Sequence, residues 1–235
     1  MPNSPAASAA SEPALAEAAR NLRLRTASAL VLAPIAIVAI WLGGWSFCAL
    51  AIVFGAGLTF EWGQLCTRSH RAFSLASGTG IIWAAAAALI WLRARAYGLG
   101  NVLFLLSLVW STDIGAYLVG RTFGGPRLAP RISPGKTWAG AIGGVVFAAC
   151  AGIAAAAVGG TGAPRAVAIA AGLSIIAQAG DLAESAAKRR FGVKDSGRLI
   201  PGHGGLLDRL DSTLAVALAG ALLAFLRGAG VVLWK

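Results

Sequence analysis

The sequence predicts an all-α polytopic membrane protein, with about seven transmembrane helices in one bundle. Of its 235 residues, 57% are hydrophobic and only 12% are charged, whereas soluble domains average about 25% charged residues. The mean hydropathy is +0.74. The 31 glycines and the many alanines suit transmembrane helices that pack closely.

Seven apolar segments approach the roughly 20 residues that a helix needs to cross a bilayer. A preceding tail, residues 1–20, is rich in Ala, Ser and Pro and is predicted to be disordered. It lacks the charged-then-apolar order of a signal peptide. The predicted spans are 26–43, 45–65, 74–92, 100–120, 138–159, 165–187 and 210–227.

The net charge of +11 comes from basic residues that stand mainly between the apolar segments. This placement favours the positive-inside rule and anionic lipid headgroups over nucleic acid as the explanation. With a cytoplasmic N-terminus, the basic clusters around Arg23, Arg68, Arg127 and Lys188 fall on one side of the membrane. Arg93 and Arg95 fall on the other side, so either the rule is broken once or a segment boundary is misplaced. The three cysteines lack metal-type spacing.

Five of the nine acidic residues lie between Asp181 and Asp211. A carboxylate at the bilayer centre costs roughly 2.5–3.5 kcal/mol on insertion scales, so such acids usually serve a function. Asp181, Glu184 and Lys188 are spaced i, i+3, i+7 and share one helical face. One interpretation is a helix end with a Glu184–Lys188 pair. We favour a metal and phosphate site at the membrane edge, because Asp181 has no obvious local partner.

A glycine-rich basic loop follows, and its GHGG run, residues 202–205, leads into an apolar helix. Free backbone N–H groups at a helix start can receive a phosphate. Asp208 and Asp211 then lie at i, i+3 in the first turns, where the helix dipole alone would also favour them. A phosphate or loop-organising role is favoured for His203. Without a second histidine nearby, His203 does not indicate zinc.

Two further segments carry candidate residues. Asp113 is the only acid of a long apolar segment, and Tyr117 follows at helical spacing. In RISPGKTW, Ser133 is predicted to cap a helix with Pro at its first position, which turns Lys136 toward a phosphate. The segment is not a P-loop, because the GxxxxGK[ST] pattern is missing. The sequence leaves open whether Glu61 is functional or structural.

Asp-rich sites without Cys or His clusters prefer Mg²⁺ or Mn²⁺. Carboxylates, cations and a glycine-rich loop on one side of the membrane therefore indicate metal-dependent phosphoryl or nucleotidyl transfer. A transporter would spread its acids across the membrane depth. A CDP-alcohol phosphotransferase would show a DG…AR…G…D…D pattern, which is absent.

The segment from Ser185 to Asp211 resembles the signature of the phosphatidate cytidylyltransferase family, also called CDP-diacylglycerol synthases. TDIGAY at 112–117, SPGKTW at 133–138 and GDLAES at 180–185 are also similar to that family, in the expected order. The resemblance is strong over residues 110–215, and Ala187 departs from it, since the family carries a larger apolar residue there. It implies a membrane domain over 21–235, with N-terminal helices over 26–92 and a catalytic part over 100–227.

The resemblance implies that the protein transfers CMP from CTP to phosphatidate, with Mg²⁺, and gives CDP-diacylglycerol and pyrophosphate in phospholipid biosynthesis. It also implies a homodimer in the bacterial inner membrane, an active site facing the cytoplasm, no nucleic-acid partner, and room for a second cation. Asp181 and Asp208 are the leading metal ligands, with Asp113 and Asp211 as alternatives. The expected catalytic residues are Asp181, Asp208, Lys188, Lys194, Asp195, His203, Arg209 and Asp211, and the expected substrate-binding residues are Lys136, Ser133, Arg189, Gly204, Gly205 and Tyr117.

Overall fold

The computed structural model describes residues 11–67, 72–197, 199, 204–228 and 230–235. Within these residues, seven helices are long and apolar enough to cross a membrane. The predicted all-α class and the seven predicted spans are therefore confirmed. The helices are α2 (Ser11–Leu42), α3 (Gly44–Thr67), α4 (Ala72–Arg93), α5 (Gly98–Phe123), α6 (Trp138–Val158), α7 (Ala163–Arg190) and α8 (Leu207–Leu226).

The first described helix begins earlier than the sequence predicts. Helix α2 starts at Ser11, so residues 11–20 are helical and not part of a disordered tail. Its first turns carry Ala, Leu, Glu and Arg, which are strong helix formers. The rest of the predicted tail, residues 1–10, lies outside the described residues.

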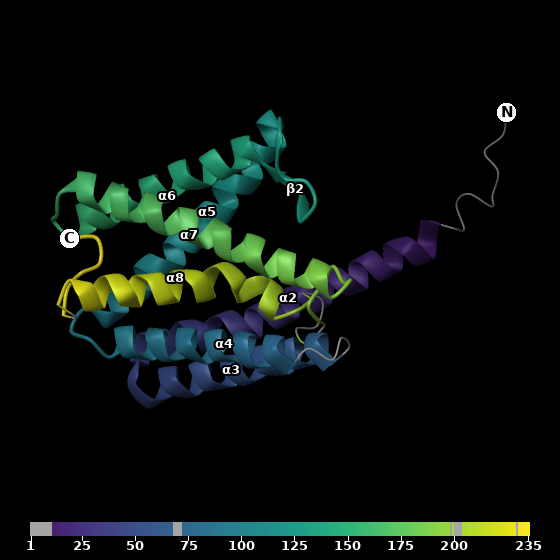
Figure 1. The fold of residues 1–235 in the computed structure, drawn as a ribbon, viewed down its shortest axis with the longest axis horizontal. Coiled ribbons are helices and arrows are strands. Elements are labelled where there is room, and N and C mark those ends of the chain that lie inside the picture. The colour runs from purple at the N-terminus through teal and green to yellow at the C-terminus, as the bar shows by residue number, and fades with distance from the viewer. Residues whose placement is uncertain (1–10, 68–71, 198, 200–203, 229) are drawn as a thin grey trace.

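Helix α8 joins two groups of helices. It packs against α7 on one side and against α4 on the other. Helices α5, α6 and α7 form the upper group in Figure 1, and α2, α3 and α4 form the lower group. Leu105 and Leu108 of α5 and Val216 of α8 belong to the buried core that ties the groups together. Since α8 starts where the predicted site loop ends, this contact fixes the loop between the two groups.

Helices α5 and α6 approach each other closely through glycines. A Cβ atom at Gly115 would lie 2.7 Å from the carbonyl oxygen of Gly143, so neither position has room for a side chain. Such small-residue contacts are typical of transmembrane helix pairs. The close approach holds the C-terminal half of α5, which carries Asp113 and Tyr117, firmly against α6.

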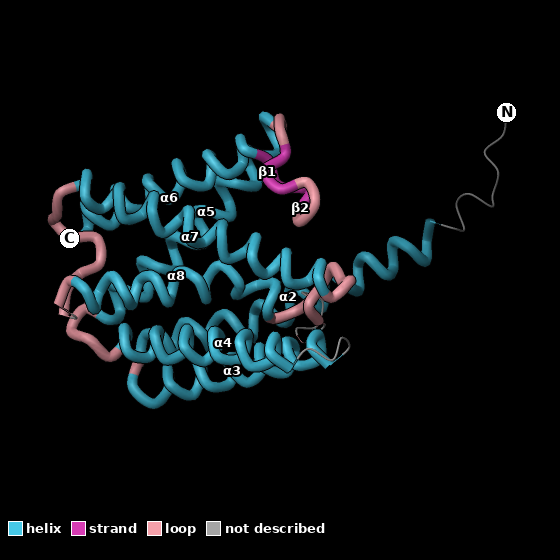
Figure 2. Tube along the Cα trace, in the orientation of Figure 1, coloured by secondary structure: helices cyan, strands magenta, loops and turns pink. Residues whose placement is uncertain are grey.

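A short antiparallel hairpin connects α5 to α6, with β1 at Arg127–Ala129 and β2 at Ser133–Thr137. Figure 2 shows it at one end of the bundle. The prediction that Ser133 caps a helix is wrong, because Ser133 starts β2. Thr137 is the N-cap of α6, and its hydroxyl accepts a hydrogen bond of 3.1 Å from the N–H of Gly140. The helix cap therefore lies four residues later than predicted, at Thr137 and not at Ser133. Lys136 still lies next to the start of α6.

The hairpin and the loop after α7 lie at the same end of the bundle, and the turn before α7 lies at the other end (Figure 2). Arg93, which broke the positive-inside pattern, lies at that other end and has a structural partner there. Its guanidinium donates hydrogen bonds of 2.8 Å to the carbonyl oxygens of Ile40 and Trp41. These are among the last carbonyls of α2, which have no partner within their own helix. Arg93 thus closes the end of α2.

Substituting Gly115 by Ala should destabilise the protein, because the added methyl group would separate α5 from α6. We expect a loss of about 1–3 kcal/mol, as for other overpacked cores, measured as a lower melting temperature in detergent. Gly172→Ala is the control, since a Cβ there meets nothing within 4 Å. Equal melting temperatures for the two variants would contradict the close contact.

Candidate active site

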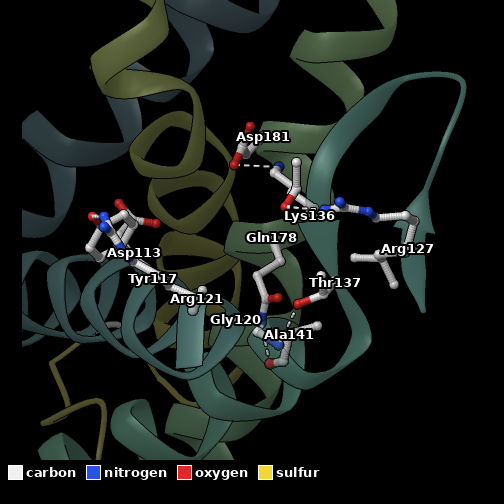
Figure 3. Close-up of a pocket in the computed structure, with 14 residues that line it drawn as sticks. Asp113, Tyr117, Gly120, Arg121, Arg127, Lys136, Thr137, Ala141, Gln178 and Asp181 are labelled. Carbon is white, nitrogen blue, oxygen red and sulfur yellow. Dashed lines mark hydrogen bonds and ion pairs between the residues drawn. The ribbon is translucent and has the colours of Figure 1, made fainter. Parts of the chain in front are cut away.

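The first of two polar pockets lies between α5, the hairpin, α6 and α7, and has a volume of about 400 Å³. Lys136 from β2 forms an ion pair with Asp181 of α7 across it (Figure 3). Asp181 therefore has a partner that the sequence did not reveal. Tyr117 also lines this pocket, and its hydroxyl accepts a hydrogen bond of 2.6 Å from Arg121. Figure 3 shows Asp113 on the α5 side of the same pocket.

The second polar pocket lies where α7 ends, the following loop turns and α8 begins, and has a volume of about 380 Å³. It gathers most of the basic residues predicted for phosphate binding, together with Ser133 of the hairpin. Lys194, Asp195 and Arg189 are exposed there. The lining residues are Ser133, Ser185, Lys188, Arg189, Lys194, Asp195, Gly197, Gly204, Asp208 and Arg209.

Lys188 links α7 to α8 through two carboxylates. Its ammonium group lies 2.7 Å from Glu184, one turn earlier on α7, and 2.6 Å from Asp208 on α8. The helix-end pair that the spacing predicted is thus present, and the same cation also bridges to the second helix. The backbone N–H of Ser196 donates to both oxygens of Asp208, at 3.3 and 3.2 Å. Asp208 is therefore fixed by a cation and by the loop at once.

The predicted carboxylates fall into two groups along the α7–α8 contact. Asp211 interacts electrostatically with Asp181, Glu184 and Asp113. Asp113 in turn interacts with Asp181 and with Lys136. Asp208 belongs instead with Lys188 and Glu184. Glu184, buried between the helices, interacts with both groups.

The donor chemistry of this region fits magnesium. Its acidic side chains offer only oxygen ligands, which Mg²⁺ prefers. Among the described residues, no three His, Cys, Asp or Glu side chains come together as a complete metal-binding group. Mg²⁺ is commonly held by one or two carboxylates together with substrate phosphates. Asp181 and Asp208, each now paired with a lysine, suit that partial role.

The glycines of the GHGG run serve conformation and packing in the described part of the loop. Gly204 has a φ of 86°, in the region that favours glycine. A Cβ atom on Gly205 would come within 2.8 Å of Asp208 Oδ2 and would also clash with Ser196. Gly204 thus needs glycine for its positive φ, and Gly205 needs it for the close approach of its backbone to neighbouring groups. His203 lies outside the described residues.

Glu61 is the residue whose role the sequence left open, and it contacts the loop directly. Its side chain is buried in α3, with 1% of its surface exposed. Its carboxylate accepts hydrogen bonds from Ser196, Leu199 and Leu207. The only signal in the sequence was an unpaired acid inside an apolar span.

An apolar cavity of about 280 Å³ lies between α2, α3, α4, α5 and α8. Its walls are Ala, Ile, Leu, Phe and Val side chains, such as Ala51, Ala86 and Leu106. Asp113, which also lines the first polar pocket, and Arg209, which also lines the second, are its charged residues. The apolar cavity therefore shares one lining residue with each polar pocket.

Replacing Lys188 by Met should destabilise the bundle, because Glu184 and Asp208 would lose their shared cation. Removing one partner of a buried ion pair costs up to about 3–5 kcal/mol. Asp208→Asn added to Lys188→Met should recover part of the loss, since it removes one unbalanced charge. Melting temperatures in detergent measure both effects, and a single variant as stable as the unchanged protein would rule out this role.

The chain matches known proteins over most of its length. The sequence model of the Cytidylyltransferase family matches residues 80–226. A phosphatidate cytidylyltransferase of Brucella suis biovar 1 (strain 1330) is 39% identical, over 84% of this chain and 91% of the relative. Those of Rickettsia felis and Rickettsia bellii are 36% and 37% identical, over 86% and 88% of this chain and 92% and 91% of their own lengths. The chain is an integral membrane protein that belongs to the cytidylyltransferase family.

Proposed function

We propose that the protein is a phosphatidate cytidylyltransferase, which transfers CMP from CTP to phosphatidate and gives CDP-diacylglycerol and pyrophosphate. The observation that carries the proposal is that the apolar cavity shares Asp113 with one polar pocket and Arg209 with the other. The reaction joins a water-soluble nucleotide to a lipid. A site for it needs an apolar space for acyl chains that opens directly onto a polar space for phosphates.

The acyl chains of phosphatidate would occupy the apolar cavity, and its phosphate would lie at the charged end near Arg209. The lipid enters sideways between helices, while CTP enters the polar pockets from the cytoplasm. The exposed cations Lys194 and Arg189 then hold the triphosphate in the second pocket. Fixed positive charges of this kind stabilise the charge that develops during phosphoryl transfer.

The chemical step needs no strong general base, because the phosphate of phosphatidate is already an anion. One of its oxygens bonds to the α-phosphorus of CTP, and the bond between that phosphorus and the oxygen bridging the α- and β-phosphates breaks. The electron pair leaves with pyrophosphate. The protein's task is to bring two anions together, which Lys136, Lys188 and Arg209 do by lowering their repulsion.

Mg²⁺ is the proposed cofactor, with Mn²⁺ as an alternative and a second cation left open. Asp181 and Asp208 would hold the ion together with the phosphates, and Asp113 or Asp211 would complete the set. When bound, such an ion neutralises phosphate charge and stabilises the leaving group. Until substrate arrives, Lys136 and Lys188 balance the two leading carboxylates.

We further propose that the site faces the cytoplasm of a bacterial inner membrane and that the protein acts as a homodimer. The hairpin and the loop after α7, which carry many of the basic residues, lie at one end of the bundle (Figure 1). The positive-inside rule assigns that end to the cytoplasm.

Purified protein given CTP, phosphatidate and Mg²⁺ should form lipid-linked cytidine and release pyrophosphate. Asp181→Asn and Asp208→Asn should each lower kcat by about 100-fold or more, the scale of losing one group that stabilises a transition state. Arg165→Gln, at the opposite end of α7, is the control and should stay active. No lipid product from the unchanged protein would refute the function, and full activity in either Asn variant would refute its metal assignment.

Ala86→Phe should raise the KM for long-chain phosphatidate several-fold by filling the apolar cavity, with little effect on the KM for CTP. A short-chain phosphatidate should be affected less. Ala87→Phe is the matched control, since Ala87 is exposed and does not line the cavity. Equal effects on long and short chains would place the acyl chains elsewhere.

A further inference from the structure

Glu61 stands apart from both polar pockets, yet it contacts the loop that builds the second one. It lies within the α3 span, where a carboxylate costs free energy to insert. Each of its hydrogen-bond partners in the described part of the chain is a neutral donor from the region between α7 and α8. The site charges Lys188 and Asp208 pair with each other and not with Glu61.

Glu61 acts as an N-cap for α8 from a different helix. The first N–H groups of a helix lack partners within it, and a side-chain oxygen usually supplies one. At α8 the N-cap residue is Leu206, whose side chain makes no capping hydrogen bond. The N–H of Leu207 instead donates to Glu61 Oε2 at 2.9 Å. A carboxylate at this end is also favoured by the helix dipole.

The same carboxylate holds the loop that precedes α8. Ser196 Oγ donates to Glu61 Oε2 at 3.3 Å, and the N–H of Leu199 donates to Oε1 at 3.2 Å. Ser196 in turn donates its own N–H to Asp208. A continuous set of hydrogen bonds thus runs from Glu61 through Ser196 to Asp208, and from there to Lys188.

The packing leaves little freedom in this arrangement. A Cβ atom on Gly197 would lie 2.7 Å from Glu61 Oε1, so the backbone rests directly on the carboxylate. Leu206 and Leu207 share a buried apolar cluster with Leu58 and Leu65 of α3, which lie on either side of Glu61 in the sequence. Polar and apolar contacts therefore dock the loop on the same stretch of α3.

We propose that Glu61 is a positioning residue of the active site, which caps α8 and fixes the preceding loop so that Asp208 meets Lys188. The proposal rests on the proposed function for its catalytic consequence, but the docking of the loop stands independently of it. The substrate phosphates and the metal do not contact Glu61 in this scheme.

Glu61→Gln is the decisive variant. Both oxygens of Glu61 accept from backbone N–H groups, so either orientation of a Gln amide turns an NH₂ group toward an N–H donor. We expect kcat to fall by about 10- to 100-fold, as for other residues that orient a site's ligands, with a smaller change in the KM for phosphatidate. Gly197→Ala, which displaces the carboxylate without changing it, should lower kcat in the same way.

Asn101→Leu is the matched control. Asn101 is as buried as Glu61, and it also anchors backbone, through Val231 and Leu233 near the C-terminus. The Asn101→Leu variant should have a lower melting temperature but an unchanged kcat. Trypsin cleavage after exposed Lys194 gives a readout that needs no activity, and it should be several-fold faster in Glu61→Gln than in Asn101→Leu.

Wild-type kcat and cleavage rate in Glu61→Gln would overturn the proposal. The proposal would also be overturned if the loss of kcat stood in the same proportion to the loss of melting temperature in Glu61→Gln and in Asn101→Leu. Glu61 would then be a structural residue only. An inactive wild-type protein would refute the proposed function instead, and the cleavage rates would still decide whether Glu61 docks the loop.

Discussion

The site depends on the two ion pairs of Lys188, because its ammonium group balances one carboxylate from α7 and one from α8. Inside an apolar bundle, an acid without a partner is costly, and two acids facing each other are more costly still. The side chains of Glu184 and Asp208 are 7% and 18% exposed, so solvent screens them little. The ion pairs allow helices that carry so many acids to pack together at all.

The second lysine, Lys136 of the hairpin, balances the charge of Asp181 in the same way. The three ion pairs of Lys136 and Lys188 lie at the same end of the bundle as the hairpin and the loop after α7. Positive charge there has two roles. It balances the carboxylates within the bundle, and it would also attract the phosphates of the proposed substrates.

Much of the fold could be predicted, because span length and hydropathy depend only on local sequence. The i, i+3, i+7 spacing of Asp181, Glu184 and Lys188 likewise placed them on one face without tertiary information. The hairpin could not be predicted, since Ser133 followed by Pro suits a helix start as well as a strand. Only the pairing of β2 with β1 moves the cap to Thr137.

The partners of Asp181 and Glu61 were also beyond prediction. Lys136 lies far from Asp181 in the sequence, and Glu61 meets Ser196 across a separation of 135 residues. Contacts at such distances depend on how the helices pack and not on local spacing. In the sequence, Glu61 is therefore only an unpaired acid in an apolar span. In the structure, it has a definite set of hydrogen-bond donors.

The glutamate cap has a consequence for how the chain can be divided. Every residue of the family signature lies after residue 180, while the acceptor for the start of α8 comes from α3, in the first third of the chain. A fragment that began at α5 would carry the whole signature and both lysines, yet it would lack that acceptor. The site is therefore a property of the entire bundle, and the N-terminal helices that carry no recognisable motif are part of what makes the motif work.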